Sequence, residues 1–305
     1  MKILISTSSF GLEDPTPLRL LTDAGIEFEL NPYGRKLTEA ESISLLKDKI
    51  GLLAGTETLN KHVLDHAPLL KVISRCGAGT DNVDLETAKS RNIAILSTPF
   101  VHSDAVAELA LAGMLALLRH LAQTHGDILA GVWKKRMGRN LRYKRVGFIG
   151  FGKVAQRLAT LIQPFQCSFF IYDPYVADEV IAEFKGSRVE LLHLASVSDV
   201  LTLHLPYSKS VNHIVGREIL SNANPDLVII NTARGGLIDE AALCDFLLAN
   251  PSAGAYLDTF EEEPYSGKLK ALSNVILSPH VGTFTRETRV AMEVEAVKNL
   301  INSLR

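Results

Sequence analysis

The feature that most constrains the fold of this chain is a glycine-rich turn between an apolar run and an amphipathic segment. The run at residues 146–149 leads directly into Gly150-Phe-Gly152-Lys-Val-Ala155, and apolar residues then recur with helical spacing up to Ile162. The first glycine permits a sharp turn, the second leaves room for a pyrophosphate beside the backbone, and a small third residue allows close helix packing. The order strand, turn, helix predicts a dinucleotide-binding unit.

An acidic residue supports this interpretation. The apolar run at residues 169–172 ends at Asp173, about twenty residues beyond the turn, where a carboxylate would accept hydrogen bonds from a ribose 2′-OH. No arginine follows directly, and the acid favours NAD over NADP because a 2′-phosphate would meet an anion. A simpler interpretation is that Asp173 only caps the segment 174–175. The predicted cofactor contacts of this region are Gly150, Gly152, Lys153, Val154 and Asp173.

Composition excludes several classes of protein. The chain has 305 residues, 47% hydrophobic and 22% charged, as expected for a globular enzyme of two domains. A net charge of −2 gives no electrostatic basis for binding nucleic acid or an acidic membrane surface, and residues 105–118 are too few to span a bilayer. Three scattered cysteines and the absence of signal-peptide features predict a cytoplasmic protein. No glutamate completes a site with His62 and His66, so no metal is expected.

Strand and helix patterns alternate along the chain. Before the glycine-rich turn, strands are predicted at residues 2–6, 26–30, 50–54, 70–75 and 93–96. From the turn onward they are predicted at residues 146–149, 168–172, 200–205, 227–231, 253–257 and 275–277. A long apolar helix at 105–118 separates the two groups, and a helix at 285–304 ends the chain. The pattern predicts an α/β protein with two doubly wound parallel sheets.

Residues suited to proton transfer follow three strands of the second group. Arg234 follows the strand at 227–231, Asp258 and Glu263 follow the next, and His280 follows the last. Because ligands bind at the carboxyl ends of parallel strands, these side chains are expected to converge there. A guanidinium can hold a substrate carboxylate, and an imidazole paired with an acid can move a hydroxyl proton. The set favours hydride transfer at a hydroxyl carbon.

Taken in order, these motifs resemble the D-isomer-specific 2-hydroxyacid dehydrogenase family, and within it the short phosphoglycerate dehydrogenase type. The resemblance covers nearly the whole chain. It depends on Gly150-Phe-Gly152-Lys-Val-Ala155 with Asp173, His204-Leu-Pro206, Asn231-Thr-Ala-Arg234-Gly235-Gly236, Asp258 with Glu263-Pro264, and Ser278-Pro279-His280. It implies a flavodoxin-like substrate domain at residues 1–98 plus 284–305 and a Rossmann NAD-binding domain at 99–283. A homodimer is also implied, with the helix at 105–118 as a candidate surface.

The resemblance implies a role for each motif. Arg234 would hold the substrate carboxylate, and His280 would donate or accept the proton. Glu263 would pair with His280, since an adjacent anion favours the charged imidazole. Asp258 would accept a hydrogen bond from the nicotinamide carboxamide. The other residues expected to line the cofactor cleft are His204, Pro206, Thr232, Ala233, Arg234 and His280.

The first domain would supply Gly77-Ala78-Gly79, whose amides can form an anion-binding nest for the substrate carboxylate. Arg75 stands where phosphoglycerate dehydrogenases carry an arginine associated with the substrate phosphate. It favours D-3-phosphoglycerate and 3-phosphohydroxypyruvate, with a solvated surface arginine as the alternative. Domain closure would bring this segment over the substrate and exclude water. Phe100 and His102 depart from the family pattern, so the shape of the substrate site there is left open.

Two other functions stay open at this point. A glyoxylate/hydroxypyruvate reductase, or another 2-keto acid reductase, would use the same residues. An NAD(H)-sensing binding protein resembling the corepressors of this family would instead report the cofactor state through a partner surface. The intact set of Arg234, Glu263 and His280 argues against the sensor, and turnover of 2-keto acids with NADH separates the two classes.

Overall fold

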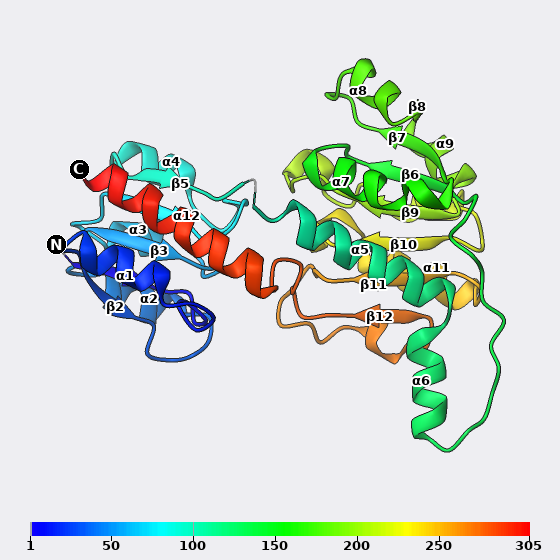
Figure 1. Ribbon diagram of the computed structural model, residues 1–305, viewed down its shortest axis with the longest axis horizontal. Helices are drawn as coiled ribbons and strands as arrows, with labels where there is room; N and C mark the ends of the chain where they lie inside the picture. Colours follow the sequence, from blue (N-terminus) through cyan, green and yellow to red (C-terminus); the bar gives the residue numbers. More distant parts are fainter. Residues whose placement is uncertain (1, 100) are drawn as a thin grey trace. The chain divides into compact units, whose positions relative to one another are not determined.

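The computed structural model describes residues 2–99 and 101–305, which form two compact units (Figure 1). Unit 1 comprises Met1–His102 and Phe284–Arg305, and unit 2 comprises Ser103–Thr283. The chain enters unit 2 at Ser103, a few residues beyond the boundary expected from the sequence, because the first helix of unit 2 starts there. Phe100, one of the two departures from the family pattern, lies outside the described residues.

Unit 1 is built on a five-stranded parallel sheet with the order β2-β1-β3-β4-β5, which is the flavodoxin-like order. The strands are β1 (Lys2–Ile5), β2 (Glu27–Leu30), β3 (Gly51–Ala54), β4 (Val72–Arg75) and β5 (Ala94–Leu96). The helices are α1 (Thr16–Asp23), α2 (Glu39–Leu46), α3 (Lys61–Asp65), α4 (Leu85–Ser90) and α12 (Arg286–Leu304). Strands β3 and β4 are buried along their whole length, since helices cover both faces of the sheet.

The C-terminal helix α12 completes unit 1. It lies beside α1 on one face of the sheet and contacts β3 and β4 (Figure 1). Its apolar stripe of Ala296, Val297 and Leu300 is fully buried, and the Ser74 hydroxyl donates to the Ala296 carbonyl over 2.8 Å. The sheet of unit 1 therefore depends on both ends of the sequence.

Unit 2 contains a seven-stranded parallel sheet with the order β12-β11-β10-β9-β6-β7-β8. The strands are β6 (Arg145–Ile149), β7 (Ser168–Tyr172), β8 (Ser187–Arg188), β9 (Val200–Leu203), β10 (Val228–Asn231), β11 (Gly254–Leu257) and β12 (Val275–Leu277). The order reverses between β6 and β9, which is the switch point where dinucleotides bind in Rossmann folds. The two predicted doubly wound sheets are thereby confirmed.

The helices of unit 2 cover both faces of this sheet. They are α5 (Ser103–Leu118), α6 (Leu121–Leu129), α7 (Lys153–Ile162), α8 (Asp178–Glu183), α9 (Leu191–Val197), α10 (Arg217–Ser221) and α11 (Glu240–Ala249). The sequence pattern missed α6, α9, α10 and β8. Short 3₁₀ turns lie at η1 (Gln163–Phe165), η2 (Lys209–Val211), η3 (Gly235–Leu237) and η4 (Lys268–Ala271).

Helix α5 is buried largely within its own unit. It packs on α7, β10 and β11, and Ala107, Ala110 and Met114 are fully buried. Gly113 faces the ring of Tyr256 so closely that a Cβ atom would overlap it, which explains a glycine inside a helix. Within the described residues no single helix is long and apolar enough to cross a membrane. Among these residues, only α5 and α6 taken together have the length and the apolar composition of a membrane span, and that pair is bent by 62°.

Helix α6 and the segment after it contrast with α5, because α6 has no buried residue. In Figure 1 they extend away from the rest of unit 2. The segment also carries the basic residues Lys134, Lys135, Arg136 and Arg139. Large apolar side chains are exposed here, namely Leu121, Ile128, Leu129, Val132, Trp133 and Met137.

Candidate active site

The glycine-rich turn joins β6 to α7 at the switch point of unit 2. Gly150 has φ +83°, and a Cβ atom there would lie 2.8 Å from the His204 carbonyl oxygen, so only glycine fits. Gly152 precedes Lys153 and Val154 at the start of α7. No neighbouring heavy atom lies within 4 Å of the position that a Cβ atom on Gly152 would occupy. Ala155 is fully buried. The turn thus leaves open space beside the amides of a helix N-terminus, which fits a pyrophosphate.

The carboxylate of Asp173 stabilises this turn from the end of β7. One oxygen accepts the Phe151 amide over 2.7 Å, and the other accepts the amides of Tyr175 and Val176 over 2.8 and 3.1 Å. The simpler capping role is therefore present. An ionised carboxylate has about four acceptor sites and three are used, so a ribose hydroxyl can still be accepted. Arg188 from β8 also donates to the Asp173 carbonyl and pairs with Asp178.

His204 and Pro206 follow β9, the neighbouring strand at the switch point. The Nε2 atom of His204 lies 2.8 Å from the Thr202 hydroxyl. The residue as a whole is half-buried, yet burial of its imidazole lowers the pKa of His204 to about 3. A neutral ring is unsuited to proton transfer near neutral pH, and the cofactor contact of His204 stays a prediction.

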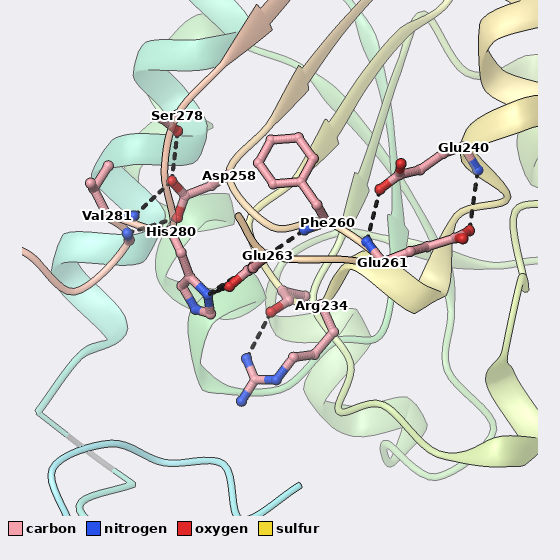
Figure 2. Close-up of polar contacts among 11 residues, drawn as sticks. Arg234, Glu240, Asp258, Phe260, Glu261, Glu263, Ser278, His280 and Val281 are labelled. Atoms are coloured by element: carbon pink, nitrogen blue, oxygen red, sulfur yellow. Dashed lines mark hydrogen bonds and ion pairs between the residues drawn. The ribbon is translucent and has the colours of Figure 1, made fainter. Parts of the chain in front are cut away.

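Arg234 lies just beyond β10 in a loop shaped by Asn231. The Asn231 amide donates to the Arg234 carbonyl over 2.8 Å, and its oxygen accepts the Ala233 amide over 3.0 Å. The Arg234 Nη1 atom donates to the Ala233 carbonyl over 2.7 Å. Thr232 is buried at the start of this loop. The loop sets the base of the Arg234 side chain, which extends beyond the strand end in Figure 2.

Glu263 and His280 form a pair beyond the ends of β11 and β12 (Figure 2). The imidazole Nδ1 lies 2.9 and 3.1 Å from the two Glu263 oxygens, and the Phe260 amide donates to Glu263 over 3.2 Å. The two side chains are 37% and 38% exposed, which leaves the pair accessible to a ligand. With Nδ1 held by a carboxylate, Nε2 is the ring nitrogen suited to exchange a proton with a substrate.

Asp258 organises the turn that presents His280. Its carboxylate is fully buried and accepts the Ser278 hydroxyl over 2.6 Å and the amides of Val281 and Gly282 over 2.8 and 2.7 Å. Its carbonyl accepts the His280 amide over 2.8 Å. These bonds enclose His280, whose φ of +55° is uncommon for a residue with a side chain. The contact of Asp258 with the nicotinamide remains a prediction. The hydrogen bonds of Asp258 support a role in positioning His280.

Ser278 and Tyr256 extend the hydrogen-bond network of Asp258, and the sequence did not predict this role for either residue. The Tyr256 hydroxyl lies 2.7 Å from the Ser278 hydroxyl, and burial raises the pKa of Tyr256 to about 12. Residues i and i+2 of a strand share a face, so the spacing of Tyr256 and Asp258 was the available signal. The sequence could not show that Ser278, which follows β12, bonds to both side chains.

The predicted substrate residues of unit 1 lie together after β4. Arg75 is 6% exposed, and its Nε atom donates to the Gly79 carbonyl over 3.0 Å. The position of a Cβ on Gly77 lies 3.6 Å from Nη2 of Arg75, so the guanidinium runs along this glycine-rich segment. Ala78 is exposed between the two glycines, and His102 is half-buried. Arg75 thus helps to shape the proposed anion nest.

Comparison with known proteins agrees with this geometry. Residues 111–282 match the family model described as D-isomer specific 2-hydroxyacid dehydrogenase, NAD binding domain. The chain is 37% identical to a glyoxylate reductase of Thermococcus litoralis, over 81% of this chain and 77% of that protein. It is also 37% identical to a D-3-phosphoglycerate dehydrogenase of Methanocaldococcus jannaschii, over 84% of this chain but only 50% of the longer relative.

A solved structure extends the likeness to the whole fold. The TT0316 protein of Thermus thermophilus superposes with a TM-score of 0.89 at 30% identity, covering 100% of this chain and 97% of that one. The chain therefore belongs to the D-isomer-specific 2-hydroxyacid dehydrogenase family and is an NAD-dependent oxidoreductase.

Proposed function

We propose that this enzyme interconverts a D-2-hydroxy acid and its 2-keto acid, with Arg234, Glu263 and His280 as the catalytic residues. The observation that carries the proposal is the contact of 2.9 Å between Glu263 and the Nδ1 atom of His280. A carboxylate in that position orients the ring and stabilises it when charged. The NAD(H)-sensing alternative is not favoured, because the relatives are named as reductases and dehydrogenases.

In the direction of reduction, His280 donates the Nε2 proton to the carbonyl oxygen of the keto acid. The hydride would be supplied by NAD in its reduced form when it is bound, and accepted by its oxidised form in the reverse direction. Arg234 holds the substrate carboxylate and polarises the carbonyl group. Glu263 stabilises the imidazolium before the transfer, and His280 then regains a proton from solvent. The reverse reaction uses the same groups with His280 as the base.

As the substrate pair we propose D-3-phosphoglycerate and 3-phosphohydroxypyruvate, with Arg75 as the cation for the phosphate. One observation favours a second candidate, glyoxylate or hydroxypyruvate. Arg75 is buried and directs Nε to the Gly79 carbonyl, as expected for an arginine that shapes the glycine-rich segment. The two candidates differ in whether the substrate carries a phosphate, and kinetics can decide between them.

A panel of keto acids with NADH tests both proposals. If Arg75 binds phosphate, Arg75→Ala should raise KM for 3-phosphohydroxypyruvate by about 10- to 100-fold, since a charged hydrogen bond contributes about 1.5–3 kcal/mol, and KM for hydroxypyruvate should change little. An equal loss for both acids would instead support the shaping role. Absence of turnover with every acid would contradict the proposed reaction.

We also propose that the enzyme is a homodimer, with α6 and the following segment as the contact surface. The helix at 105–118, the surface suggested by the sequence, buries its most apolar face inside unit 2. By contrast Trp133 is 85% and Met137 93% exposed, close in sequence to the exposed Leu129. Large apolar side chains that gather in one exposed segment often mark a contact with a partner.

Sedimentation of surface variants tests the dimer. Leu129→Glu combined with Trp133→Glu should convert a dimeric wild type into monomers, because two carboxylates would have to be desolvated at the contact. Leu248→Glu is the matched control, since Leu248 is 62% exposed on α11 and outside the proposed surface. A wild type that sediments as a monomer, or a dimer that survives both glutamates, would contradict this contact.

A further inference from the structure

Glu261 lies two residues before Glu263 and makes contacts of a different kind. In Figure 2 the two side chains extend in opposite directions, Glu263 toward His280 and Glu261 toward Glu240 at the start of α11. The Glu261 amide donates to the Glu240 carboxylate over 2.8 Å, and the Glu240 amide donates back to Glu261 over 3.4 Å. The pair of reciprocal bonds fixes the backbone at Glu261 to the helix that follows the Arg234 loop.

His213 is the second contact of the Glu261 carboxylate. Its Nε2 atom lies 2.9 Å from Glu261, and its amide donates to the Gly236 carbonyl over 2.8 Å. His213 thus contacts the loop of Glu263 through its ring and the loop of Arg234 through its backbone. Burial, together with the charge of Glu261, raises the pKa of Glu240.

The two loops are also in direct backbone contact. A Cβ atom on Gly235 would overlap the carbonyl group of Phe260 and the amide of Glu261. Arg234 and Gly236 are the sequence neighbours of Gly235, and Glu263 lies three residues after Phe260. Any movement of Glu261 is therefore transmitted to the backbone that carries Arg234.

We propose that Glu261, held by Glu240 and His213, is a positioning residue that fixes Arg234 relative to the pair of Glu263 and His280. This inference depends on the proposed reaction, in which Arg234 orients the keto acid that His280 protonates. Misplacement of reacting groups by about 1 Å can cost about 10²-fold in rate. Removing the two side-chain contacts of Glu261 should therefore affect the transition state rather than the binding of cofactor.

The test compares Glu261→Ala with Glu261→Gln and Glu262→Ala. We expect Glu261→Ala to lower kcat and kcat/KM together by about 10- to 100-fold, as for an interaction made in the transition state, with NADH affinity unchanged. Glu261→Gln should restore most of kcat because its oxygen can accept from Glu240 and His213. Glu262→Ala, an exposed neighbour, should keep wild-type rates. Full activity of Glu261→Ala, or an equal loss in Glu262→Ala, would overturn the proposal.

A second measurement separates positioning from a general loss of stability. Amide hydrogen exchange should become faster at residues 234–238 in Glu261→Ala, although these are distant from the substitution in sequence. His213→Asn removes the imidazole contact while tolerating the φ of +52°, and its effect on kcat should be non-additive with Glu261→Ala. Additive effects with unchanged exchange would overturn the proposal. A wild type without turnover would overturn the proposed reaction itself, which distinguishes the two failures.

Discussion

Substituting His280 by asparagine is expected to lower kcat by about 10²- to 10⁴-fold, the usual contribution of a general acid or base. Asparagine tolerates positive φ, so it should preserve the backbone turn in which His280 has φ +55°. It cannot transfer a proton at neutral pH. Steady-state turnover of the best keto acid with NADH measures the loss, and quenching of protein fluorescence measures NADH affinity, which should stay near the wild-type value.

Two further variants make this result specific. Glu263→Gln should lose less activity than His280→Asn, because the amide still contacts Nδ1 but no longer stabilises the imidazolium. Asp258→Asn removes the charge that accepts the amides of Val281 and Gly282, so it should misplace His280 and also lower thermal stability. If His280→Asn lost NADH affinity to the same extent as turnover, a role for His280 in proton transfer would be wrong.

Gly235→Ala is expected to destabilise the enzyme and to abolish most of its activity. The added methyl group would overlap the Phe260 carbonyl and the Glu261 amide, and backbone atoms cannot rotate aside as a flexible side chain can. Overpacking of a core usually costs about 1–3 kcal/mol, and a clash with backbone should reach the upper end of that range. Thermal unfolding should occur several degrees lower, and kcat should fall because Arg234 and Glu263 are displaced together.

Gly126→Ala is the control for this substitution. Gly126 lies inside α6, and no heavy atom lies within 4 Å of its Cβ position. Alanine in an exposed helix is favoured over glycine by about 0.5–1 kcal/mol, so the variant should unfold at or slightly above the wild-type temperature. A Gly235→Ala enzyme with wild-type stability and turnover would show that the two loops are not in close contact.

Much of the fold could be predicted because its signals are local. Uninterrupted apolar runs such as β3 and β10 indicate strands buried on both faces, and the capping box of Thr38 and Glu41 marks the start of α2. Helix α6 was missed because it has only nine residues and a glycine, Gly126, in its interior, so its few apolar residues gave a weak helical signal. Strand β8 has only two residues, too few for any pattern.

The sequence by itself determined that a dinucleotide turn precedes three strand ends that bear an arginine, acids and a histidine. Each of these motifs consists of a few adjacent residues, and adjacent residues dictate their own local backbone geometry. The resemblance already implied that Glu263 pairs with His280, but only the tertiary structure shows the contacts of the three neighbouring acids. Asp258, Glu261 and Glu263 lie within six positions of one another, yet one is buried beneath the His280 turn, one contacts α11 and one pairs with the imidazole. Those partners come from other strands and helices, and sequence spacing carries no information about contacts between segments that meet only on folding.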